Sequence, residues 1–148
     1  MYANWGINAL VVLTTALAVA LSVMLHYEGL TQMARRLPSI AGQRHAKVLY
    51  GIFGVVILHV VEIWVFGTIA WGLLAIPGVG HVAGADTLGL LDAVYLSAVT
   101  FTTVGFGDLA PVGPIRFLCG MEALSGFVLI TWSASFTYLE MNRFWRVG

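Results

Sequence analysis

Charged side chains are scarce in this sequence. Only 9% of its 148 residues are Asp, Glu, Lys or Arg, whereas 59% are hydrophobic, and the mean hydropathy is +0.91. A soluble domain of this length would lack the polar surface that water requires. The composition therefore excludes an ordinary soluble protein and predicts that lipid surrounds most of the chain.

Cysteine is almost absent, and the net charge is zero. The single cysteine, Cys119, excludes an intrachain disulfide and a cysteine metal cluster. Seven basic and seven acidic residues balance, so the dense positive surface that binds nucleic acid is missing, and we expect no nucleic-acid partner. No serine-elbow, phosphate-loop or cysteine motif is present, so we expect neither an enzyme nor a cofactor beyond bound ions.

Three long apolar stretches predict three transmembrane helices. They run from Trp5 to about His26, from Val48 to about Ile76 and from Ile115 to about Leu139. Each stretch reaches the roughly 20 residues that cross a bilayer as a helix. No Lys or Arg precedes the first stretch, which disfavours a cleaved signal peptide.

Basic residues predict the orientation of these spans. Short cytoplasmic loops carry an excess of Lys and Arg. In this chain such residues link the first two spans or follow the third span: Arg35, Arg36, Arg44, Lys47, Arg143 and Arg146. The N-terminus is therefore expected outside and the C-terminus in the cytoplasm. A compact, uncleaved chain of this kind suits a bacterial plasma membrane.

The segment between the first two spans, residues 28–47, is predicted as a cytoplasmic amphipathic linker. It mixes apolar and basic side chains around Pro38 and Gly42, which fits a helical extension, a break and a short amphipathic piece at the membrane surface. The simpler alternative, which we favour, is a solvated loop.

A shorter apolar segment, residues 90–102, predicts a helix that enters the membrane only halfway. The helix is expected to start near Asp92, and its C-terminus directs a partial negative charge towards the middle of the membrane. The next residues are Thr103-Val104-Gly105-Phe106-Gly107-Asp108, in which two glycines permit backbone conformations closed to other residues. Helix and loop together would attract a cation.

The run Thr102-Thr103-Val104-Gly105-Phe106-Gly107-Asp108 resembles the selectivity-filter signature of the pore-loop potassium channels. The resemblance extends over about Val48 to Tyr138, and the first span has no counterpart in the simplest members. It implies an all-α membrane protein with three transmembrane helices, a re-entrant pore helix and a filter loop, assembled as a homotetramer. The expected regions are an extra helix (1–27), the linker (28–47) and the pore domain (48–148).

The resemblance also implies where ions bind. Potassium ions would be held by the backbone carbonyls of Thr103, Val104, Gly105 and Phe106 and by the Thr103 hydroxyl. Supporting residues would be Thr102, Gly107, Asp108 and Tyr95, with Tyr95 bonded to Asp108 or merely anchored at the interface. Phe106 lacks a hydroxyl that many members use to tie the filter to the pore helix. Each missing hydrogen bond removes about 1 kcal/mol of net stabilisation, so we expect a more easily inactivated filter.

Gating residues are expected on the third span. Gly126 aligns with the family's hinge glycine, although a glycine there equally permits tight helix packing. Phe127, Ile130 and Ala134 are expected to face the central cavity, and Tyr138 to lie near a cytoplasmic constriction that gates by dewetting.

Ionisable residues inside the spans usually pair with one another. We therefore expect His59, Glu62 or Arg116 to meet Glu122 behind the pore helix. This network is either static or a proton-sensitive gate, and the static form is favoured because structural networks are common. A metal site is a further alternative, weakened by its single histidine.

The sequence thus predicts a subunit of a potassium-selective channel that conducts passively. A weakly selective cation channel and a non-conducting assembly subunit are the alternatives. No span carries the spaced arginines of a voltage sensor, so pH, lipid, tension or an unidentified regulatory partner would open the pore.

Overall fold

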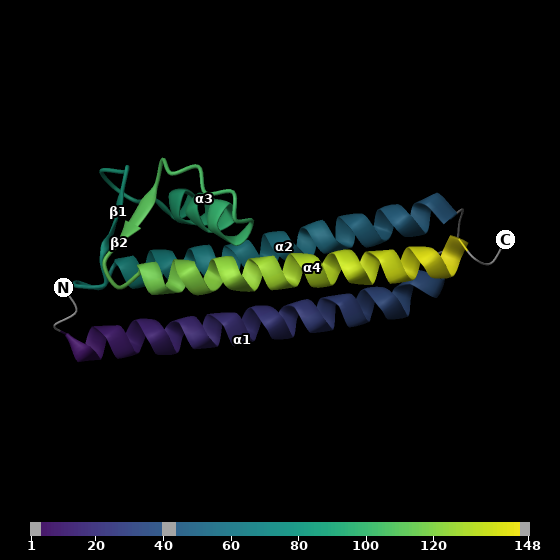
Figure 1. Cartoon of the computed structure of the whole chain (residues 1–148), viewed down its shortest axis with the longest axis horizontal. Coiled ribbons are helices and arrows are strands. Elements are labelled where there is room, and N and C mark those ends of the chain that lie inside the picture. Colours follow the sequence, from purple (N-terminus) through teal and green to yellow (C-terminus); the bar gives the residue numbers. More distant parts are fainter. Residues whose placement is uncertain (1–3, 40–43, 146–148) are drawn as a thin grey trace.

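The computed structural model describes residues 4–39 and 44–145, and these contain four α-helices. Three are long: α1 (Trp5–Arg36), α2 (Arg44–Leu74) and α4 (Arg116–Trp145). They lie alongside one another, and the short helix α3 (Leu90–Phe101) sits against one end of the bundle, the end where α1 and α4 begin (Figure 1). All three long helices are apolar and long enough to cross a membrane. The chain is therefore an all-α integral membrane protein, as its composition predicts.

The first helix is longer than the first predicted span. α1 continues through Arg36 and leads into a short 3-10 helix, Leu37–Ser39, which contains Pro38. Residues 28–36 are therefore helical, and the favoured expectation of a solvated loop is wrong for them. The α-helix ends at Arg36, two residues before Pro38, which has no backbone N–H to continue the helical hydrogen bonds. Gly42, and with it the middle of the expected amphipathic piece, lies outside the described residues.

One narrow stripe of α1 is buried. Its members recur every three or four residues, which places them on one helical face: Val11, Thr15, Ala18, Ser22, His26, Leu30 and Met33. Several are small, which lets α1 approach α2 and α4 closely. The other faces of α1 expose large apolar residues such as Leu13, Leu17 and Met24, as expected of a helix bordered by lipid.

Helix α3 is wedged between α2 and α4. Phe101, at its end, is fully buried with Phe66 of α2 and with Leu118 and Leu129 of α4. The rings of Phe66 and Phe101 lie 6.3 Å apart between centroids and are tilted by 52°, within the range that aromatic pairs prefer. This core fixes the position at which the segment after α3 begins.

Two short strands pair across the segment that connects α2 to α4 and contains α3. β1 (His81–Ala83) pairs antiparallel with β2 (Ala110–Val112), with Val82 opposite Pro111. A further backbone bond runs from the Ile115 N–H to the Val79 carbonyl at 3.0 Å. This pairing brings the start and the end of the connecting segment together, so α3 and the loop after it are anchored at both ends.

Candidate functional site

The segment Thr103–Asp108 starts directly where α3 ends. At the other end of α3, the Asp92 carboxylate accepts a hydrogen bond from the Gly89 N–H at 2.9 Å, which satisfies a backbone donor that the helix leaves free. Near the C-terminus, the Thr102 hydroxyl donates to the Ala98 carbonyl at 2.7 Å. The predicted helix of residues 90–102 is thus present as Leu90–Phe101, and its partially negative end adjoins the loop.

The backbone of this loop alternates in conformation. Thr103, Gly105 and Gly107 have φ values of 59°, 53° and 80°, and they are the residues of the loop with positive φ. Alternation of left-handed and right-handed residues turns successive N–H groups to one side of the chain, and the carbonyls therefore point to the other side. Thr103 is the one described non-glycine residue with positive φ, a strained conformation that proteins keep mainly at functional sites.

Two hydrogen bonds show which side of the loop faces α3. The Gly105 N–H donates to the Val99 carbonyl at 3.0 Å, and the Thr103 N–H donates to the Thr100 carbonyl at 2.9 Å. The N–H groups of Thr103 and Gly105 are therefore tied back to the helix. Val99 supports the loop through its backbone, in a position where its side chain offers no polar group.

The predicted contact between Tyr95 and Asp108 is present. The Tyr95 hydroxyl donates to an Asp108 carboxylate oxygen at 2.8 Å, which ties the far end of the loop to α3. This hydrogen bond raises the pKa of the Tyr95 phenol above its ordinary value of 10.0, because ionisation would remove the shared proton and place two negative groups together. Loop residues Val104 and Phe106 are 55% and 72% exposed.

The residues predicted to gate lie on α4, which is one continuous helix through Gly126. Phe127, Ala134 and Tyr138 are exposed in the single chain, whereas Ile130 packs against the core. Ile130, Ala134 and Tyr138 also border a groove between α4 and α2. Gly126 is buried against the end of α3, so close packing accounts for a glycine at this position.

The predicted meeting of His59, Glu62 or Arg116 with Glu122 is wrong. Glu122 is buried and accepts a hydrogen bond from the Ser97 hydroxyl of α3, and Arg116 is exposed at the start of α4. The Ser97 hydroxyl also lies 2.8 Å from the Ile63 carbonyl of α2. Because α3 supplies this hydroxyl between α2 and α4, it satisfies Glu122 without any partner from the His59–Glu62 pair.

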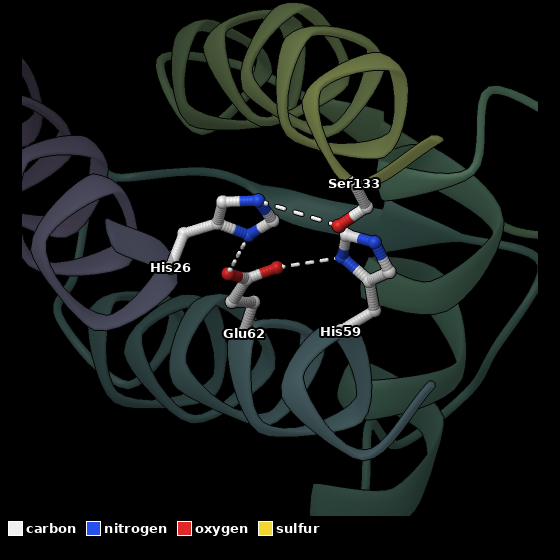
Figure 2. A network of polar contacts seen from close by, with 4 residues as sticks. All are labelled: His26, His59, Glu62 and Ser133. Carbon is white, nitrogen blue, oxygen red and sulfur yellow. Dashed lines mark hydrogen bonds and ion pairs between the residues drawn. The ribbon is translucent and has the colours of Figure 1, made fainter. Parts of the chain in front are cut away.

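Glu62 has its own partners, one of which the sequence analysis missed. Its carboxylate lies between His59 of the same helix and His26 of α1, each 2.8 Å away through Nδ1 (Figure 2). His26 also contacts the Ser133 hydroxyl of α4 at 3.3 Å. The position of His26 four residues after Ser22, on the small-residue stripe of the first helix, was the available signal.

Comparisons with known proteins identify the family. The sequence model of a family described as "Ion channel" matches residues 45–139, which include α2, α3, the loop and most of α4 but leave α1 outside. The chain is 34% identical over 67 residues to "Protein LctB" of Geobacillus stearothermophilus, covering 45% of this chain and 50% of that protein. It is 44% identical over 48 residues to "Protein LctB" of Bacillus caldotenax, covering 32% and 36%.

A plant protein is also similar to this chain, but the match covers a smaller share of that protein's length. The chain is 44% identical over 59 residues to "Two pore potassium channel b" of Oryza sativa subsp. japonica, covering 40% of this chain and 16% of that protein. The matches span half or less of each of these three relatives. No solved structure gives a significant match. The family match covers more than half of the sequence and contains the loop described above, and the chain therefore belongs to the ion channel family, within the pore-loop superfamily that its filter signature resembles.

Proposed function

We propose that this chain is the subunit of a homotetrameric potassium-selective channel that conducts ions passively across a membrane. The observation that carries the proposal is the alternating backbone of residues 103–107, in which the N–H groups of Thr103 and Gly105 are tied to α3. This alternation favours carbonyls that point to the other side of the loop. A row of such carbonyls can replace the water around a dehydrated potassium ion. The named plant relative, a two pore potassium channel, supports the choice of ion.

In this proposal the potassium ions are bound by the carbonyls of Thr103, Val104, Gly105 and Phe106 and by the Thr103 hydroxyl. One chain supplies one carbonyl at each level, so a ring requires several chains around a common axis. The high exposure of Val104 and Phe106 in the single chain is consistent with neighbouring subunits at this surface. Conduction through such a pore needs no chemical step, so we propose no enzymatic activity.

The proposed orientation places the N-terminus outside and the C-terminus in the cytoplasm of a bacterial plasma membrane. Arg35 and Arg36 end α1, Lys47 lies in the first turns of α2, and Arg143 lies in the last turn of α4. All these residues lie at one end of the bundle, opposite α3 and the loop (Figure 1). A clustered basic end is the arrangement expected of the cytoplasmic side. In this orientation Tyr138 would lie towards the cytoplasmic end, where a regulatory partner could act on the pore.

The proposal is tested by potassium flux from lipid vesicles that contain the purified protein. The decisive variant is Gly105→Ala, because alanine disfavours the left-handed conformation by about 1–2 kcal/mol. The matched control is Gly120→Ala on α4. At both positions an added Cβ meets nothing within 4 Å, so the two variants differ in backbone conformation rather than in available space.

We expect potassium flux that exceeds sodium flux, is lost in Gly105→Ala and persists in Gly120→Ala. Equal potassium and sodium flux would support a weakly selective cation channel instead. No flux from correctly folded protein at any pH or membrane tension would favour a non-conducting assembly subunit and overturn the proposal. Flux that survives in Gly105→Ala would show that ions pass elsewhere.

A further inference from the structure

We propose that His26, His59 and Glu62 form a binding site for a divalent transition-metal ion, specifically Zn²⁺, where α1, α2 and α4 meet. This inference does not depend on whether the pore conducts potassium. The donors of this cluster are imidazole nitrogens and one carboxylate, whereas the proposed potassium ligands are backbone oxygens.

The donor atoms already converge. The two Glu62 carboxylate oxygens lie 2.8 Å from His26 Nδ1 and 2.8 Å from His59 Nδ1, and one ligand atom from each residue falls within 4.8 Å of the others. Figure 2 shows the carboxylate between the two imidazole rings. Ligand atoms of one tetrahedral zinc ion lie about 3.3 Å apart, given metal–ligand bonds of about 2.0–2.2 Å. Side-chain shifts smaller than a bond length would therefore admit the ion.

The donor types select the ion. Two imidazoles with one carboxylate are a common zinc ligand set, whereas magnesium and calcium prefer oxygen ligands alone. The cluster is strongly desolvated, because the side chains of His26 and Glu62 are fully buried and that of His59 is 16% exposed. A buried carboxylate in a membrane span requires a cationic or hydrogen-bonding partner, and a divalent cation would satisfy it together with both rings.

The surroundings resemble the support that proteins build around metal ligands. A histidine that binds a metal through one ring nitrogen usually forms a hydrogen bond through the other. His26 meets this requirement, since its Nε2 lies 3.3 Å from the Ser133 hydroxyl of α4. His59 Nε2 is buried and has no hydrogen-bond partner in the described part of the chain, so this ring forms its hydrogen bond through Nδ1 and keeps one nitrogen unsatisfied.

An ion can reach the cluster along the bundle. His59 and Ser133 border the groove between α2 and α4, which has a volume of about 440 Å³ and extends past Tyr138 to Met141 near the end of α4. Three protein ligands leave a fourth position of a tetrahedral site open on this side. Because His26 comes from α1 and the other two ligands come from α2, a bound ion would also link α1 to a helix that the family match includes.

The test measures Zn²⁺ binding to the full-length protein, purified in detergent and stripped of metal, by equilibrium dialysis. We expect one Zn²⁺ per chain and at least tenfold weaker binding in each of His26→Gln, His59→Gln and Glu62→Gln. Ser133→Ala should weaken binding by about 10-fold to 100-fold through the loss of support for His26. The matched controls are His45→Gln and His81→Gln, which alter exposed histidines outside the cluster and should bind as the wild type does.

A spectroscopic measurement on the wild type keeps the proposal testable if a variant does not fold. The X-ray absorption of the zinc-loaded protein should show two imidazole nitrogens and at least one oxygen around the metal. Absence of saturable binding, binding that the three cluster variants leave unchanged, or a zinc environment without two imidazoles would overturn the site. Loss of binding in the His45 or His81 variants would assign the metal to the protein surface and would also overturn it.

Discussion

Gly126 of α4 lies against the backbone of Phe101, the last residue of α3. A Cβ added at Gly126 would come within 2.0 Å of the Phe101 carbonyl oxygen and 2.7 Å of its carbonyl carbon. Backbone atoms cannot yield as a flexible side chain can, so α3 would have to move. The contact therefore fixes the position of the segment Thr103–Asp108, which begins two residues further along the chain.

We expect Gly126→Ala to destabilise the protein by about 1–3 kcal/mol, the usual cost of overpacking a core. This corresponds to a fall of about 2–4 °C in the melting temperature for each kcal/mol. The measurement is thermal unfolding of the purified protein in detergent. A hinge role alone predicts altered gating with an unchanged melting temperature, and that result would contradict the packing explanation.

Gly120→Ala is the control for that experiment. Gly120 lies on the same helix, and an added Cβ there meets nothing within 4 Å. Alanine is favoured over glycine in a helix by about 1 kcal/mol, so Gly120→Ala should leave the melting temperature unchanged or raise it.

Ser97→Ala should destabilise the protein by about 1–3 kcal/mol. The hydroxyl of Ser97 contacts both the Ile63 carbonyl and the Glu122 carboxylate, and its removal leaves a buried carboxyl without this partner. The control is Ser22→Ala, because the Ser22 hydroxyl is buried with no hydrogen-bond partner among the residues that the structure describes. Equal melting temperatures for the two variants would show that the bridge through Ser97 contributes nothing.

Tyr95 should lose its proton only at strongly alkaline pH. The hydrogen bond to Asp108 raises the pKa of the phenol above 10.0, so the neutral form is favoured in the folded protein. The stabilisation from this bond is therefore complete below pH 10 and disappears as the pH rises through the raised pKa. Ultraviolet titration of the tyrosines should show a late phase that Tyr95→Phe removes.

Asp108→Asn provides the matched test of the cause. It keeps the size of the side chain but removes the negative charge, so the late phase should move to lower pH rather than vanish. If the wild type, Tyr95→Phe and Asp108→Asn titrated alike, the Tyr95–Asp108 bond would not exist in solution.

Phe106→Tyr should slow the loss of current during prolonged opening. The added hydroxyl offers each subunit one more hydrogen bond, worth about 1 kcal/mol, and a barrier raised by that amount makes a step about fivefold slower. Phe53→Tyr, at an exposed position of α2, is the control and should not change the decay. A wild-type current that does not decay at all would contradict the idea that the filter inactivates easily.

Features that lie within one contiguous stretch of residues could be predicted from the sequence. The three membrane spans follow from the length of apolar chain that a bilayer requires, and the pore helix with its filter follows from a motif of adjacent residues. The contact between Tyr95 and Asp108 was also accessible, because the resemblance to the pore-loop potassium channels implies it. The short strands β1 and β2 were not foreseen, since three residues are too few to show an alternating pattern.

The pairing of polar residues that are distant in the chain could not be predicted from the sequence. Glu62 and Glu122 were expected to share a network, but each is satisfied by a different helix: Glu62 by α1 and by its own helix, and Glu122 by α3. The boundary of α1 was likewise misjudged, because the polar residues after His26 suggested a loop where the chain remains helical.

The sequence by itself determined that this protein has three membrane spans and a glycine-containing loop after a short helix, because hydrophobic length and a local glycine pattern act through neighbouring residues. Only the tertiary structure decided that His26 joins His59 and Glu62, and that Ser97 reaches Glu122. Those contacts depend on how helices that are remote in the chain rotate and pack against one another, and no periodicity within a single helix specifies the face that its neighbour will meet.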